Sequence, residues 1–276
     1  GIGIAGTHGK TTTTSMISLV LMEGNLDPTV IVGGKLSGLG GTNARLGRGD
    51  FIVVEADEFD RSFLSITPTI AVLTTLETDH LDCYRDLEDI KGAFIQFASK
   101  VPFYGFVVLC LDEPALLDIM PQLSKKKIIT YGLNPQADVQ AVDIRHKDNT
   151  STFTVVRDGI DLGQVTIQVP GNHNVQNSLA AIAVGLHLGV SFDNVRAGIE
   201  KFAGVYRRWE KRVRSTGSRC TMTMRTIRQS VVQPSQVQKP AGGGALFASF
   251  SLISTPGRAI SMKSSENRSC FQTYLS

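Results

Sequence analysis

The chain opens GIGIAGTHGKTTTT (residues 1–14), and the central run is Gly6-Thr7-His8-Gly9-Lys10-Thr11-Thr12. The apolar segment GIGIA is typical of a strand, and residues 11–24 have the apolar spacing of a helix. A glycine turn between a strand and a helix favours an anion, because backbone N–H groups and the helix N-terminus point toward it. We expect Lys10 to reach the β- and γ-phosphates of a nucleotide and the Thr11 hydroxyl to bind Mg²⁺. Ile4 stands where the strict phosphate-loop pattern has glycine, so this loop is a variant.

Strand-like and helix-like segments alternate as far as residue 135. The strand-like segments after GIGIA are PTVIVGG, FIVVEAD, TIAVLTTL, FVVLCL and KKIITYG, and the helix-like ones include LEDIKGAFIQFASK and PALLDIMPQL. This alternation predicts an α/β fold of the phosphate-loop type, a mostly parallel sheet with flanking helices. Residues 138–169 predict a small antiparallel section with a turn at Asp158-Gly159, and helices are expected at about 174–188 and 192–202.

Acidic side chains and a histidine follow two of the predicted strands, in EADEFD (55–60) and ETDHLD (77–82). Ligands of parallel sheets bind beyond the carboxyl ends of the strands, where carboxylates can hold Mg²⁺. Glu55 is the best candidate for that role. His80 could ligate a second cation or contact a transferred phosphoryl group, although a histidine at a strand end is often structural. The other carboxylates of the first motif are equally well explained as loop charges: Asp57, Glu58 and Asp60.

Two further motifs are weaker. PGNHNVQN (170–177) opens a helix, and its His173, Asn174 and Asn177 could bond adenine or ribose. The alternative is a helix cap followed by a polar first turn. The glycines and Thr-Asn of residues 33–44 predict a flexible loop after a strand, which alone indicates little.

Taken together, these motifs resemble the Mur ligase family. GTHGKTTT, EADEFD, ETDHLD, PGNHNVQNSLAA and GVYRRWE follow one another as in the central ATP-binding domain of that family, over about residues 1–210. The resemblance implies an ATP-dependent enzyme that activates a carboxylate as an acyl phosphate, which an amine then attacks. Such catalysis consists mostly of positioning and charge neutralisation.

The resemblance also implies a role for individual positions. By motif, it assigns Lys10, Glu55 and His80 to catalysis; Gly6, Thr7, His8, Gly9, Lys10, Thr11, Thr12, Asn174, Asn177 and Arg208 to ATP; Thr11, Glu55 and His80 to Mg²⁺; and Gly34, Thr42 and Asn43 to a sugar nucleotide.

The histidine in GTHGK and the glycine loop are most similar to family members that join L-alanine to UDP-N-acetylmuramate, which are therefore the expected substrates. Alternatives are a ligase that recycles murein tripeptide, a folylpolyglutamate-type ligase, and a nucleotide-binding fragment without chemistry. We expect a cytoplasmic location, and infer no membrane, nucleic-acid or obligate protein partner. Four cysteines without a CxxC pair indicate neither a disulfide framework nor a zinc site.

The net charge of +3 conceals two compositions. Residues 1–210 carry 18 basic and 24 acidic side chains, whereas residues 211–276 carry 10 basic side chains and one acidic side chain, Glu266. The basic tail is the only support for a nucleic-acid-binding protein, and it also fits a disordered extension.

A sharper hypothesis is that residues 211–276 are read in a shifted frame. The family's C-terminal domain is expected to carry DDYAHHP and FQPHxYTRT, and neither occurs. Shifted by one frame, residues 220–229 are compatible with YDDYAHHPA, and residues 249–265 with FQPHLYTRTRDFHEEF. We therefore expect a tail without a native fold. The chain also begins without Met, and the family's N-terminal domain is expected to precede it. Alone, the chain is expected to lack ligase activity.

Overall fold

A computed structural model of the chain describes residues 1–36, 42–59, 61–77, 83–205, 209–211, 221–225, 251–253 and 259–262. The chain divides into two compact units, Gly1–Val205 and Tyr206–Ser276. In the second unit, the described residues form an antiparallel sheet in the order β11-β12-β14-β13. Its strands are β11 (Trp209–Lys211), β12 (Thr221–Arg225), β13 (Ser251–Ile253) and β14 (Ala259–Met262). The shifted-frame hypothesis concerns the DNA and stays a prediction.

The described part of the first unit is built on one ten-stranded sheet in the order β10-β9-β8-β7-β6-β5-β1-β4-β2-β3. The strands are β1 (Ile2–Ala5), β2 (Thr29–Leu36), β3 (Thr42–Arg45), β4 (Ile52–Glu55), β5 (Ile70–Leu73), β6 (Phe106–Cys110), β7 (Ile128–Gly132), β8 (Val139–Lys147), β9 (Thr150–Arg157) and β10 (Ile160–Ile167). In this order, every neighbouring pair between β8 and β2 is parallel. The outer pairs β10-β9, β9-β8 and β2-β3 are antiparallel. The turn at Asp158-Gly159 lies between β9 and β10 as predicted.

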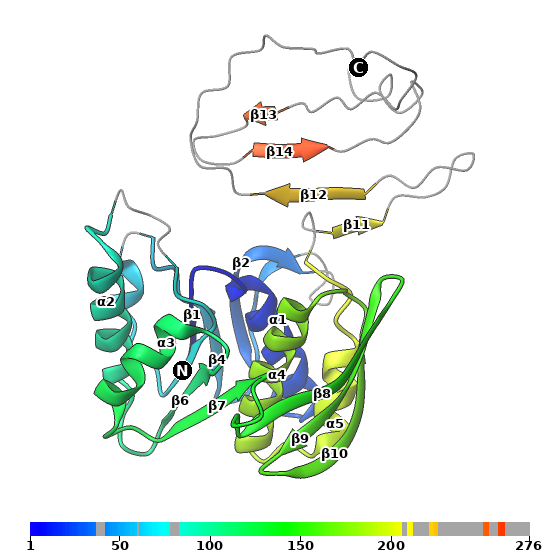
Figure 1. Cartoon of the computed structure of the whole chain (residues 1–276), viewed down its shortest axis with the longest axis horizontal. Helices are drawn as coiled ribbons and strands as arrows, with labels where there is room; N and C mark the ends of the chain where they lie inside the picture. The colour runs from blue at the N-terminus through cyan, green and yellow to red at the C-terminus, as the bar shows by residue number, and fades with distance from the viewer. Residues whose placement is uncertain are drawn as a thin grey trace. The chain divides into compact units, whose positions relative to one another are not determined.

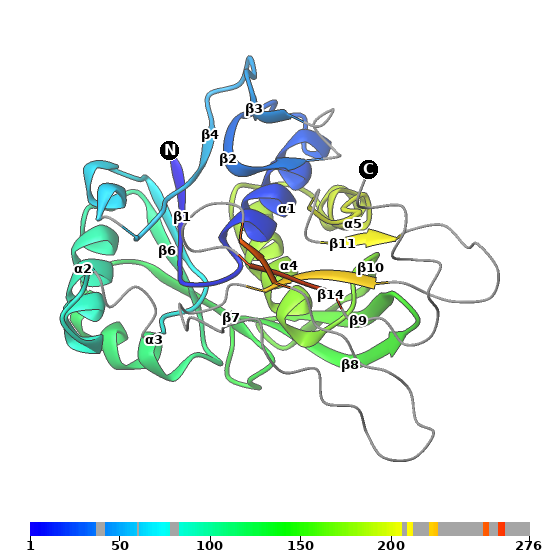
Figure 2. The same ribbon diagram turned by 90° about the horizontal axis from the view of Figure 1, so that it is seen from above.

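Helices cover both faces of this sheet. They are α1 (Lys10–Glu23), α2 (Leu87–Ser99), α3 (Pro114–Ile119), α4 (Asn172–His187) and α5 (Phe192–Glu200), with short 3₁₀ turns at Ser62–Ser65 and Met120–Leu123. Helices α1, α4 and α5 pack together on one side of the strands, and α2 lies on the other (Figures 1 and 2). The central strands β1, β5 and β6 are buried along their whole length, as expected of parallel strands covered on both faces. The predicted α/β fold is confirmed.

Helix α2 shows how local sequence fixes an element. The Asp86 side chain caps it by accepting the Asp89 N–H at 2.8 Å. The apolar positions Ile90, Phe94 and Phe97 recur at helical spacing and are buried. Phe63 from the preceding 3₁₀ turn lies against both phenylalanines, with ring centroids 5.6 and 5.1 Å away. This face therefore attaches the helix to the sheet.

Three boundaries differ from the predicted ones, each for a local reason. Strand β5 ends at Leu73 rather than continuing to Leu76, because the residues that follow bond to the turn after β1. The helix expected over 114–123 changes to 3₁₀ geometry at Met120–Leu123, where Pro121 has no N–H to continue the α-helical bonds. Residues 42–44, expected within a flexible loop, belong to the edge strand β3, which pairs with β2.

The strand order places the functional motifs together. β1 lies between β4 and β5, and all three run parallel. Their carboxyl ends, at Ala5, Glu55 and Leu73, therefore reach the same edge of the sheet. The segments that follow are 6–9, 56–59 and 74–77. Loops at the carboxyl ends of neighbouring parallel strands are where α/β sheets bind ligands.

Candidate functional site

Two glycines allow the turn between β1 and α1 to form. Gly6 has φ +151°, and a Cβ there would lie 2.0 Å from Thr74 Oγ1. Gly9 has φ +84°, and a Cβ there would lie 2.5 Å from Asn177 Oδ1. A side chain at either position would meet both backbone strain and a neighbouring group. The turn therefore requires glycine at both positions.

The turn is fastened to the segment 74–77 by a series of hydrogen bonds. The Thr7 N–H donates to the Thr75 carbonyl at 3.0 Å, and the His8 N–H donates to Thr75 Oγ1 at 2.8 Å. The Thr74 hydroxyl donates to the His8 carbonyl at 2.5 Å, and the Glu77 N–H donates to Thr7 Oγ1 at 2.9 Å. The main-chain N–H groups of Thr7 and His8 thus hold the turn in place. The sequence did not indicate the part played by Thr75, because this residue belongs to no motif.

The first N–H groups of helix α1 follow directly after this turn. Helix α1 begins at Lys10, and its first intrahelical bond runs from the Thr13 N–H to the Gly9 carbonyl at 2.8 Å. The N–H groups of Lys10, Thr11 and Thr12 precede that bond, so they have no carbonyl of their own helix to donate to. Together with the positive end of the helix dipole, they are suited to an anion.

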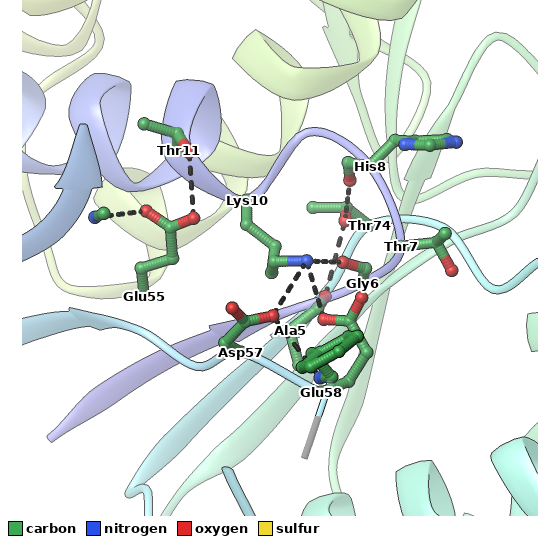
Figure 3. A network of polar contacts seen from close by, with 12 residues as sticks. Ala5, Gly6, Thr7, His8, Lys10, Thr11, Glu55, Asp57, Glu58 and Thr74 are labelled. Carbon is green, nitrogen blue, oxygen red and sulfur yellow. Dashed lines mark hydrogen bonds and ion pairs between the residues drawn. The ribbon is translucent and has the colours of Figure 1, made fainter. Parts of the chain in front are cut away.

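The Lys10 ammonium lies between the turn and the segment after β4 (Figure 3). Lys10 Nζ donates to the Gly6 carbonyl at 2.7 Å and to Glu58 Oε2 at 2.6 Å, and it lies 3.6 Å from Asp57 Oδ1. The Glu58 side chain is only 2% exposed, whereas that of Asp57 is 65% exposed. Burial raises the pKa of Glu58, and the charge of Lys10 acts against this rise. The sequence allowed Glu58 to be an ordinary charged residue of the loop. In the structure it is instead the buried partner of Lys10.

Thr11 and Glu55 lie together as predicted. The Thr11 hydroxyl donates to Glu55 Oε1 at 2.8 Å, and the Gly33 N–H donates to Glu55 Oε2 at 2.7 Å (Figure 3). A hydroxyl and a carboxylate fit Mg²⁺, which prefers oxygen ligands and retains several waters. In the part of the chain that the structure describes, no three His, Cys, Asp or Glu side chains gather as a metal cluster. The fit to Mg²⁺ thus rests on Thr11 and Glu55.

A more exposed charged group lies beside the turn. His8 Nε2 is 3.5 Å from Glu77 Oε2, and about half of each side chain is exposed. Glu113, which follows β6, belongs to the same surroundings: burial and the charge of Glu77 raise its pKa, and His8 lowers it. His8 therefore faces carboxylates of neighbouring strand ends, while its main chain supports the turn.

The two predicted asparagines of α4 have different surroundings. Asn177 is buried, and its Oδ1 accepts the Thr13 hydroxyl at 3.2 Å beneath Gly9. Asn174 Nδ2 donates to the Pro170 carbonyl at 2.7 Å, within the turn that opens α4. Asn177 thus lies against the turn after β1, and Asn174 bonds the turn that opens its own helix. A nucleotide contact of either asparagine stays a prediction.

The remaining predicted residues are distributed as follows. Gly34 lies in β2, and Thr42 and Asn43 lie in the edge strand β3, where both are exposed. The Thr42 hydroxyl donates to the Ala44 carbonyl at 3.0 Å. His80 and Arg208 lie outside the described residues, so their roles stay predictions. Among the described residues, no helix has the length and apolar character needed to cross a bilayer.

Comparison with known proteins identifies the family to which this fold belongs. Residues 4–185 match the model of the Mur ligase middle domain. The chain is 53% identical over 210 residues to a protein of Geotalea uraniireducens named UDP-N-acetylmuramate–L-alanine ligase, and 53% identical over 209 residues to one of the same name from Desulfatibacillum aliphaticivorans. Each alignment covers 76% of this chain and 45% of the relative. The chain thus spans about half the length of these relatives.

Solved structures show the same architecture. A UDP-N-acetylmuramate:L-alanyl-γ-D-glutamyl-meso-diaminopimelate ligase from Neisseria meningitides matches with a TM-score of 0.68 and 33% identity, over 75% of this chain and 67% of that one. A UDP-N-acetylmuramate-alanine ligase from Thermotoga maritima matches with a TM-score of 0.67 and 28% identity, over 78% of this chain and 47% of that one. Both likenesses extend the family match from sequence to fold.

Proposed function

Because this chain belongs to the Mur ligase family, we propose that residues 1–205 form the ATP-binding part of an ATP-dependent, amide-forming ligase. One observation supports this most directly. Lys10 and Thr11 open a helix whose first N–H groups face an anion site, and Glu55 lies beside the Thr11 hydroxyl. Groups suited to phosphate and to Mg²⁺ therefore lie at one edge of the sheet, which supports the proposal.

Each residue then has a specific task. The N–H groups of Lys10, Thr11 and Thr12 bind the phosphate chain, and Lys10 neutralises the charge that develops on the γ-phosphoryl group. Thr11 and Glu55 would hold Mg²⁺, which supplies charge neutralisation at the phosphate oxygens. His80, Asn174, Asn177 and Arg208 are proposed as further contacts at the motif positions given above.

The proposed reaction has two steps. A substrate carboxylate oxygen attacks the γ-phosphorus of ATP, so that an acyl phosphate forms and ADP leaves. An amine then attacks the acyl carbon, the amide bond forms, and phosphate leaves with the loss of a proton from nitrogen. This chain contributes to the first step, because its described phosphate-binding groups face the anion site and lie beside the Thr11–Glu55 pair.

We further propose UDP-N-acetylmuramate as the carboxylate substrate and L-alanine as the amine. This rests on the names of relatives that are 53% identical, against 33% for the structure whose name includes a tripeptide. Gly34, Thr42 and Asn43 are proposed to face the sugar nucleotide. Since ATP and such precursors are made in the cytoplasm, we propose the same location for this protein.

The test is an amide-ligation assay on the gene with its upstream sequence included and its frame corrected near codon 210. We expect ADP release that requires both UDP-N-acetylmuramate and L-alanine, and that is lost in Lys10→Met. Release with tripeptide but not with L-alanine would indicate the recycling ligase instead. Nucleotide binding without any turnover would support a non-catalytic fragment. The 276-residue chain itself is expected to be inactive in this assay.

A further inference from the structure

The Lys10–Glu58 ion pair lies in the same turn that the proposed function assigns to the phosphates. Lys10 is the first residue of α1, and its side chain bends back to the Gly6 carbonyl and Glu58. Its side chain is 12% exposed and that of Glu58 is 2% exposed. Away from water, the Coulomb attraction between the two hydrogen-bonded charges is larger than it is between two charges at the surface. Lys10 therefore has a strong partner before any phosphate arrives.

The segment that carries Glu58 is itself held firmly. The buried Tyr84 hydroxyl donates to the Glu58 backbone carbonyl at 2.6 Å. The Arg61 guanidinium lies over the Tyr84 ring, 4.7 Å from its centroid, and also bonds Asp89 Oδ2 of α2 at 2.6 Å. The main chain at Glu58 is thus held by Tyr84, and Arg61 links that tyrosine to α2 on the opposite face of the sheet.

Phosphate binding and the ion pair make opposing demands on Lys10. The phosphate site is formed by the N–H groups at the start of α1, whereas Lys10 Nζ is bonded to the segment after β4. An ammonium group has three N–H donors, and Nζ directs two of them to the Gly6 carbonyl and Glu58, so a phosphate oxygen that binds Nζ either shares the cation with Glu58 or displaces it. A buried carboxylate so close to Lys10 also repels the incoming anion and lowers the positive potential that the turn offers. Both effects weaken nucleotide binding.

We propose that Glu58 competes with the phosphate groups of the nucleotide for Lys10, and thereby sets the affinity of the turn for ATP. This inference rests on the proposed function. Glu58 is in this sense a positioning residue, because it acts through Lys10 and not on the substrate. Its removal should strengthen binding, and a residue that only supports the fold would not have that effect.

The experiment is a calorimetric titration of the full chain with ATP and Mg²⁺, comparing wild type with Glu58→Gln. Glutamine keeps the volume and an oxygen that can accept from Lys10, but it removes the charge. We expect ATP to bind about tenfold more tightly to this variant. The control is Glu88→Gln, which removes one carboxylate from an ion pair with Lys91 at 2.8 Å on the exposed side of α2. We expect no change in that variant. Equal or weaker ATP binding in folded Glu58→Gln would overturn the proposal.

A second variant keeps the proposal testable if Glu58→Gln does not fold. Tyr84→Phe removes only the hydroxyl that holds the Glu58 carbonyl. It should loosen the ion pair and give a smaller gain in ATP affinity, and an unchanged or lower affinity would count against the proposal. The Lys10→Met variant distinguishes a failure of the Glu58 proposal from a failure of the proposed nucleotide site. If that variant binds ATP as well as wild type does, or if wild type does not bind at all, the proposed nucleotide site itself is wrong.

Discussion

Replacing Thr75 by Val should weaken ATP binding without disturbing the fold. Valine has nearly the shape of threonine but cannot accept the His8 N–H, which Thr75 Oγ1 accepts at 2.8 Å. A single hydrogen bond of this kind contributes about 1 kcal/mol. The Thr75 carbonyl still accepts the Thr7 N–H in the variant, and the bonds from the Thr74 hydroxyl and the Glu77 N–H also remain, so the turn stays attached to the segment 74–77.

The loss of this hydrogen bond should weaken ATP binding, because the turn must be ordered before its N–H groups can contact the phosphates. If nucleotide binding restores the order that the missing bond supplied, about 1 kcal/mol is taken from the binding free energy, which corresponds to a roughly fivefold higher Kd. The assay is calorimetric titration with ATP and Mg²⁺, accompanied by thermal unfolding to verify that the chain is folded.

Two variants sharpen this measurement. Thr75→Ser keeps the hydroxyl and should bind ATP as wild type does. Thr152→Val makes the same substitution in β9, where the hydroxyl bonds that of Thr166 at 3.0 Å, and should leave binding unchanged. The reasoning fails if Thr75→Val binds like wild type, or if Thr75→Ser binds as weakly as Thr75→Val.

Three further predictions concern neighbouring groups. Gly6→Ala should lower the free energy of unfolding by about 2 kcal/mol, measured by urea denaturation, because its Cβ would lie 2.0 Å from Thr74 Oγ1; an unchanged midpoint would contradict this close contact. Glu55→Gln should largely remove the effect of Mg²⁺ on ATP affinity, so a variant that responds to Mg²⁺ as wild type does would exclude Glu55 as its ligand. The Arg85 N–H holds the pKa of Asp89 in the folded protein below its usual range. Ionised Asp89 therefore stabilises the fold at pH values above its pKa in the unfolded chain, about 3.9. This stabilisation is lost as the pH falls through the lower pKa of the folded state. Asp89→Asn should therefore be less stable than wild type at neutral pH, with the difference shrinking in acid, and a difference independent of pH would refute this role.

The predictable part of the site is the part encoded locally. Lys10 and Thr11 are identified by a contiguous motif, and Glu55 by its position at the end of a buried strand. The strand-end rule then requires these groups to meet once β1 and β4 are neighbours, which the structure confirms.

The unpredicted part depends on contacts between distant segments. Thr75 is an ordinary hydroxyl residue in the sequence, and its role arises because β5 lies on the other side of β1 and ends at Leu73. Glu58 appears in a run of acidic residues, and only its burial distinguishes it from Asp57. The nucleotide contact predicted for Asn177 stays a prediction, and the sequence did not show that the packing of α1 against α4 brings this side chain under Gly9. Burial and strand order are properties of the whole fold, so no motif reveals them.

The central claim is that the turn after β1 binds the phosphates of ATP through Lys10. Its most direct test is equilibrium binding of ATP with Mg²⁺ to the chain and to its Lys10→Met variant. We predict one site per chain, and binding weakened about tenfold or more when the ammonium is removed. Binding of equal strength in both proteins, with the fold intact, would contradict the claim.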